Sequence, residues 1–122
     1  MTTFEDFSFS RERETGEELA KKLLGTSPKL FCLCSKARVV KVFDKALQKY
    51  TDNVDHYAIL VGGPEVQWPF EVKLPKKSVD GDPFDFKVLG LGWMKPVTFE
   101  KLSATTFRYK IYFKAEGVKT LG

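Results

Sequence analysis

Four basic residues at three- and four-residue steps form the most regular charged pattern in the chain. They are Arg38, Lys41, Lys45 and Lys49, and Asp44 is the only acid between them. If residues 36–50 form a helix, the three lysines lie in one row along its surface. Lysines four residues apart repel one another, so this row indicates a surface that binds phosphate or carboxylate groups. A solvated basic face is the alternative interpretation.

A second basic pattern includes an aromatic side chain. Arg108, Lys110, Tyr112 and Lys114 alternate with apolar residues in the segment 106–115, so we expect them on one face of a strand. Cations neutralise phosphates, and a ring that stacks on a base contributes about 1–3 kcal/mol. The combination favours single-stranded DNA or RNA as the ligand over duplex. For this row too, an ordinary solvated outer face is the alternative.

The other residues that could act in catalysis or bind a metal lack the spacing that these functions require. The chain has one histidine, His56, and two cysteines, Cys32 and Cys34, for which we expect a reduced, buried state. No glycine-rich phosphate loop and no nucleophile elbow is present. We therefore expect a non-enzymatic protein without metal or cofactor. An enzyme, or a binder of an apolar small molecule, remains a further alternative.

Trp93 and Met94 suggest a different kind of ligand. They lie in a short segment between Gly92 and Pro96, which indicates an apolar loop tip. Tryptophan and methionine are enriched in protein interfaces. The alternative hypothesis is therefore a protein-interaction or assembly module, with a second copy of the chain or another protein as the partner.

The net charge of +4 is unevenly distributed along the chain. Residues 1–20 contain six acids and two bases, whereas residues 21–51 contain eight bases and one acid. A local concentration of charge attracts an anionic ligand better than a diffuse excess does. The N-terminus lacks the apolar segment of a signal peptide, and no apolar run has the length of a membrane span. We therefore expect an intracellular protein, in cytoplasm or nucleus, with no membrane partner.

The elements that position these residues are predicted from hydrophobic periodicity. Residues 30–34 and 57–61 are apolar runs that indicate buried strands on either side of the helix expected at residues 36–50. A shorter helix is expected at residues 15–25, with Thr15 as the cap of a capping box. The strand–helix–strand unit, residues 30–61, is the predicted centre of the fold.

The remaining segments predict an antiparallel sheet. Strands are expected within residues 65–115, at 66–74, 84–91 and 106–115, and the last seven residues are expected to fray. Residues 1–14 are expected to form an acidic N-terminal arm or an edge strand. Together these elements predict a single α+β domain, residues 1–122, in which two helices pack on a mostly antiparallel sheet of about five or six strands.

Overall fold

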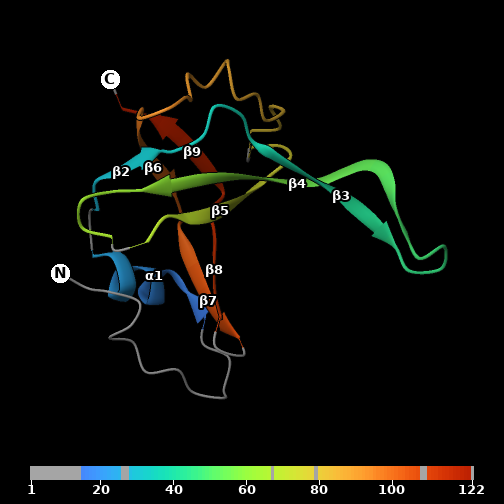
Figure 1. Ribbon diagram of the computed structural model, residues 1–122, viewed down its shortest axis with the longest axis horizontal. Helices are drawn as coiled ribbons and strands as arrows, with labels where there is room; N and C mark the ends of the chain where they lie inside the picture. The colour runs from blue at the N-terminus through green and yellow to red at the C-terminus, as the bar shows by residue number, and fades with distance from the viewer. Residues whose placement is uncertain (1–14, 26–27, 67, 79, 108–109, 122) are drawn as a thin grey trace.

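The chain folds into a curled, mixed β-sheet with one short helix packed against it (Figure 1). The computed structural model describes residues 15–25, 28–66, 68–78, 80–107 and 110–121. The elements are β1 (Thr15–Gly16), α1 (Glu17–Leu24), β2 (Leu30–Cys32), β3 (Arg38–Asp44), β4 (Lys49–Gly62), β5 (Phe70–Pro75), β6 (Pro96–Glu100), β7 (Ser103–Phe107), β8 (Lys110–Lys114) and β9 (Gly117–Thr120).

The strands follow the order β1-β7-β8-β5-β4-β2-β6-β9, and β3 pairs with β4 outside this path. Strands β5 and β8 are parallel, and the other pairs are antiparallel. In the described residues, α1 is the one helix, so the predicted α+β fold with two helices on five or six strands is wrong. The protein is mostly β. That helix is too short and too polar to cross a membrane.

The helix predicted at residues 36–50 is replaced by the hairpin of β3 and β4. Val39, Val40 and Val42 are β-branched, and such side chains favour a strand over a helix. The carboxylate of Asp44 accepts hydrogen bonds from the backbone N–H groups of Ala46 and Leu47, at 2.9 and 3.2 Å. This local pairing stabilises a turn where the helix was expected to continue.

The short helix is confirmed, and it covers one end of the core. Leu19, Ala20, Leu23 and Leu24 are buried on its inner side. The helix ends at Gly25, whose φ of 93° suits glycine and whose N–H donates to the carbonyl of Lys21. The expected capping box is wrong, because Gly16 occupies the N-cap position and no side chain caps the helix.

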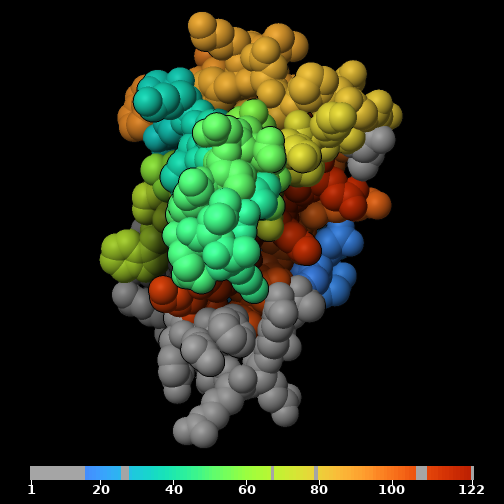
Figure 2. Space-filling view, turned by 90° about the vertical axis from the view of Figure 1, so that its right-hand side faces the viewer, coloured from blue at the N-terminus to red at the C-terminus, as the bar shows by residue number. Residues whose placement is uncertain are grey.

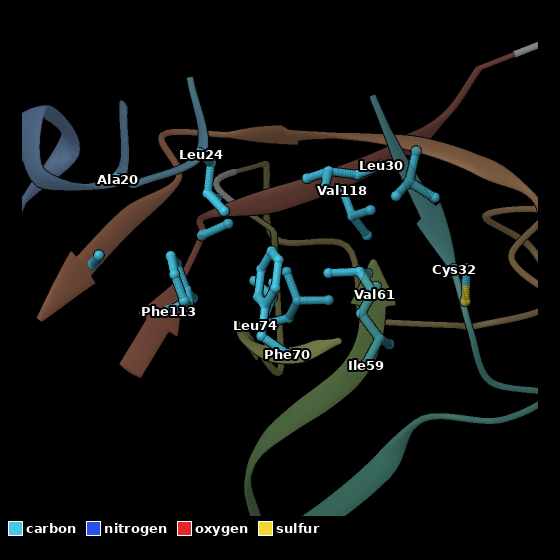
Figure 3. Close-up of a cluster of buried hydrophobic side chains, with 14 of the residues drawn as sticks. Ala20, Leu24, Leu30, Cys32, Ile59, Val61, Phe70, Leu74, Phe113 and Val118 are labelled. Carbon is cyan, nitrogen blue, oxygen red and sulfur yellow. The ribbon is translucent and has the colours of Figure 1, made fainter. Parts of the chain in front are cut away.

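The core lies between α1 and the inner face of the sheet (Figure 3). Its side chains come from elements far apart in the sequence, as Leu24 of α1, Val61 of β4 and Phe113 of β8 show. The rings of Phe70 and Phe113 join β5 to β8, with their centroids 4.4 Å apart. This packing makes the sheet a fixed frame for the side chains on its outer face.

The C-terminal half departs from the prediction in three places. Residues 84–91 form turns, because the Asp85 carboxylate accepts hydrogen bonds from the N–H groups of Lys87 and Val88. The single strand expected at residues 106–115 is instead β7 and β8, which pair with each other. The last residues, expected to fray, form β9 and pair with β6. In β5 the predicted alternation is confirmed, since Phe70, Val72 and Leu74 are buried while Glu71 and Lys73 are exposed.

The outer part of the β3–β4 hairpin projects from the body of the protein (Figure 1). Strand β5 pairs with β4 only from His56 to Val61, so residues 41–54 have no other strand beside them in the described chain. We call residues 41–54 the hairpin arm. The β3–β4 register shifts twice near Lys41, and such bulges bend and twist a hairpin.

Candidate functional site

The basic residues that were expected on one helix face are spread along the hairpin. Arg38 lies at its base, Lys41 in β3, Lys45 in the turn and Lys49 at the start of β4. Their predicted arrangement as a single helical row is therefore wrong. A hairpin places neighbouring residues on opposite faces, so the sequence spacing no longer determines which cations lie together.

Arg38 is already engaged by an acid of β5, the strand on the other side of β4. Its Nε donates to Glu71 Oε2 at 2.8 Å and its Nη2 donates to Oε1 at 3.1 Å. This pairing raises the pKa of the Arg38 guanidinium above its usual value. Lys41 Nζ donates to the backbone carbonyl of Asp52 at 3.2 Å, which ties it to the opposite strand of the arm. Arg38 is thus the least available of the four residues for an external phosphate.

A compact basic surface lies on the outer face of β5 and β8. Lys110, Tyr112 and Lys114 are exposed, whereas Ile111 is half-buried and Phe113 is buried in the core. The Cα of Lys73 on β5 is the register partner of Lys114. We call Lys73, Lys110, Tyr112 and Lys114 the basic sheet face. Arg108, which was predicted to extend this row, lies outside the described residues.

Two features of the basic sheet face favour an anionic ligand. Neighbouring parallel strands lie about 4.8 Å apart, so Lys73 and Lys114 bring like charges together, and a bound anion would relieve their repulsion. In the described part of the chain, no ion pair is seen for Lys73, Lys110 or Lys114. Tyr112 is 53% exposed, and it lies on the strand between two of these lysines.

An open cleft of about 700 Å³ adjoins this surface, and its charge is mixed: the lining includes three lysines, Lys73 and Lys114 among them, and three acids, Asp55 among them, together with His56. His56 Nδ1 lies 2.6 Å from Asp55 Oδ2. The hydrogen bond with His56 holds the pKa of the Asp55 carboxyl below its usual value, and Lys73 acts in the same direction. In the described ranges, no three histidine, cysteine or acidic side chains are grouped closely enough to hold a metal ion.

The two cysteines lie where β2 leads toward the hairpin. Both are free thiols; Cys32 is fully buried and Cys34 is partly exposed. Their Sγ atoms are 3.6 Å apart, because the chain bends after β2. Burial raises the pKa of the Cys34 thiol and so disfavours the reactive thiolate. A packing role is consistent with this geometry.

The loop tip expected at Trp93 and Met94 is a tight turn with both side chains exposed, by 66% and 51%. Lys95 N–H donates to the Gly92 carbonyl at 3.1 Å and closes the turn. Met94 N–H donates to the Cys32 carbonyl at 2.7 Å, which fixes the turn to β2. Met94 has a φ of 62°, a left-handed conformation that is costly for a residue with a side chain.

Sequence reasoning missed two parts of these surfaces. Lys73 was treated only as the outward residue of an isolated strand, since a parallel pairing of β5 with β8 has no local signal. The projecting arm was missed because its apolar residues also fit a helical period. The β-branched run at residues 39–42 and the turn-forming Asp44 were the available signals.

The chain was compared with protein-family models, with curated proteins and with solved structures, and none of these comparisons found a match.

Proposed function

We propose that this chain is a small non-enzymatic nucleic-acid-binding protein that prefers single-stranded DNA or RNA. The observation that carries the proposal is the exposed ring of Tyr112 on one face of β8 with Lys110 and Lys114. A tyrosine in this position stacks on an unpaired base while the lysines contact the adjacent phosphates.

The size of the basic sheet face supports a strand over a small anion. Residues 110 and 114 of an extended strand are about 13 Å apart, which spans more than one nucleotide. Lys73 widens the positive surface toward β4, on the same face of the sheet. An exposed ring among lysines on a sheet face suits a flexible single strand, because unpaired bases turn toward the ring and duplex bases do not.

The test is fluorescence anisotropy with labelled single-stranded DNA, single-stranded RNA and duplex of matched length. We expect the single strands to bind more tightly than the duplex. Lys110→Glu with Lys114→Glu should remove binding. The matched control is Lys87→Glu with Lys95→Glu, which makes the same charge change at two exposed positions outside β5 and β8. Absence of binding at low salt, or equal losses in the control and the double variant, contradicts the proposal.

A second candidate function is protein interaction through the turn at Trp93 and Met94. It is favoured by one observation, the left-handed backbone of Met94, which directs a large exposed apolar side chain from a position suited to glycine. Sedimentation velocity over a concentration series tests self-association through this turn. A sedimentation coefficient that rises with protein concentration, and no longer does so in Trp93→Ala, supports self-association through this turn. A chain that stays monomeric at every concentration argues against a self-assembly role.

A further inference from the structure

The tip of the hairpin arm carries apolar side chains that no other part of the described chain covers. Leu47 in the turn is 61% exposed and Tyr50 is 66% exposed. Phe43 lies beside Tyr50 across the hairpin, with ring centroids 5.0 Å apart and the rings at 63°. Figure 2 looks toward the projecting hairpin, which stands in front of the body of the protein. These residues lie at the far end of the molecule from the core.

The polar groups of the turn are largely paired within the turn itself. The N–H groups of Ala46 and Leu47 donate to Asp44 Oδ1, and the Lys45 carbonyl accepts from Gln48 Nε2 at 2.7 Å. Removing water from a backbone group that is already hydrogen bonded costs little free energy, whereas removing it from an unpaired group costs much. The tip can therefore enter an apolar environment without leaving these donors and this acceptor unpaired.

The charges around the tip are mostly positive. Residues 41–50 contain Lys41, Lys45 and Lys49 and a single acid, Asp44. The Asp44 carboxylate keeps its charge while its Oδ1 accepts the two backbone N–H groups, so three lysines against one acid leave this region net positive. Lysine side chains bury their methylene stems and keep the ammonium group in water. Aromatic rings with polar edges, such as that of Tyr50, favour the boundary between an apolar phase and water.

We propose that the hairpin arm inserts its tip into the surface of an anionic phospholipid membrane. Leu47 and Phe43 enter the boundary of the acyl chains, Tyr50 lies at the headgroups, and Lys45 and Lys49 contact lipid phosphates. Shallow insertion of apolar side chains combined with cationic attraction is the general mode of interfacial binding. The expectation of no membrane partner rested on the lack of a spanning segment, and this contact needs none.

The arrangement of apolar and basic side chains at the tip fits a lipid surface better than it fits a nucleic-acid strand or a second copy of the chain. A nucleic-acid strand uses cations and a stacking ring, but it offers no apolar phase for Leu47 at the extreme tip. A second copy of the chain would place the lysines of two arms together if it bound tip to tip, which is unfavourable. A lipid surface receives the apolar tip and the lysines at once, without a groove of matching shape.

The test measures partitioning of the full chain onto vesicles of phosphatidylcholine with or without phosphatidylglycerol. We expect binding to the anionic vesicles that weakens with salt. Leu47→Glu should lower the partition coefficient about tenfold. Replacing Lys45 or Lys49 by alanine should lower it about fivefold for each lysine. The matched control is Val88→Glu, because Val88 is 81% exposed in a distant turn and receives the same new charge.

A second measurement reports the position of the tip directly. Tryptophan emission of Leu47→Trp should shift to the blue when anionic vesicles are added, beyond any shift of Trp68 and Trp93 in the native chain. Val88→Trp should show no such additional shift. The proposal is overturned if Leu47→Glu and Val88→Glu lower the partition coefficient equally, or if the native chain does not partition onto the vesicles. A lipid-free change of sedimentation coefficient in Leu47→Glu also overturns it, since the tip is then a contact between copies.

The membrane contact is independent of the nucleic-acid proposal, and failures of the two are distinguishable. Lys110→Glu with Lys114→Glu removes oligonucleotide binding and affects vesicle partitioning only as much as the charge control Lys87→Glu with Lys95→Glu does. If replacing Lys45 and Lys49 weakens oligonucleotide binding while vesicles do not bind, the arm belongs to the nucleic-acid surface and the lipid proposal is wrong.

Discussion

The salt dependence of oligonucleotide binding tests whether the lysines and the tyrosine of the basic sheet face act in different ways. Each phosphate neutralised on a single strand contributes about −0.7 to the slope of log K against log salt concentration. Lys73, Lys110 and Lys114, with one phosphate each, therefore contribute about −2. Replacing Lys110 and Lys114 by glutamine should reduce the magnitude of the slope by about 1.4.

Tyr112 should affect affinity without affecting that slope. The residue is 53% exposed, so it is available for stacking in the free protein. Loss of stacking costs about 1–3 kcal/mol, which lowers the affinity by about 5- to 150-fold at every salt concentration. Tyr112→Ala should therefore shift the plot of log K downward and leave it parallel to the native one.

The assay is fluorescence anisotropy with a single-stranded oligonucleotide at five or more salt concentrations, on variants whose circular dichroism matches the native chain. Lys87→Gln with Lys95→Gln removes two positive charges outside β5 and β8 and corrects for the change in net charge. The reasoning is refuted if the double lysine variant keeps the native slope. It is also refuted if Tyr112→Ala changes the slope as much as the loss of two lysines does.

Three further predictions concern stability and pH. Met94→Gly should raise the free energy of unfolding by about 1 kcal/mol, because it relieves the left-handed backbone, and a lower denaturation midpoint would contradict this. Gly63→Ala should destabilise the chain by at least about 2 kcal/mol in urea denaturation, since a Cβ there clashes with the Lys29 carbonyl, and an unchanged midpoint would show that β2 shifts freely. Asp55 has a lowered pKa in the folded chain, so its stabilising contribution is present above the unfolded pKa near 3.9 and is lost as the pH falls through the folded value. Asp55→Asn should therefore weaken the acid dependence of the unfolding free energy, and identical pH profiles would argue against the His56 contact.

The parts of the fold that the sequence predicted well are those where one face is buried and the pattern is local. In β5, Phe70, Val72 and Leu74 alternate with polar residues and all three are buried. In α1, a helical period places Leu19 and Leu23 inside, and Gly25 ends the helix. In both cases the period of the apolar residues and the burial that stabilises them agree, so a short window of sequence is sufficient.

The parts that were missed depend on side-chain hydrogen bonds and on distant pairing. Asp85 and Asp44 each bind backbone N–H groups two and three residues later and turn the chain, at places where the apolar pattern indicated a strand and a helix. The division of residues 106–115 into β7 and β8 requires that the two strands pair with each other. Neither effect is visible in the spacing of apolar residues alone.

The wrong prediction of a helix at the hairpin arm follows from the same residues that make the arm a candidate binding surface. Phe43, Leu47 and Tyr50 are spaced so that a helix would bury all three on one side, and this spacing produced the wrong prediction. In the folded chain they are exposed at the end of a two-stranded hairpin, which is marginally stable without support from other elements. Large apolar side chains that stay this exposed contribute little burial to the isolated protein, so local pattern and global fold disagree there. Disagreement of this kind is concentrated at functional sites. Changing Leu47 to a polar residue should therefore leave the thermal stability of the free chain unchanged, and a marked loss of stability would show that the arm packs on its own body.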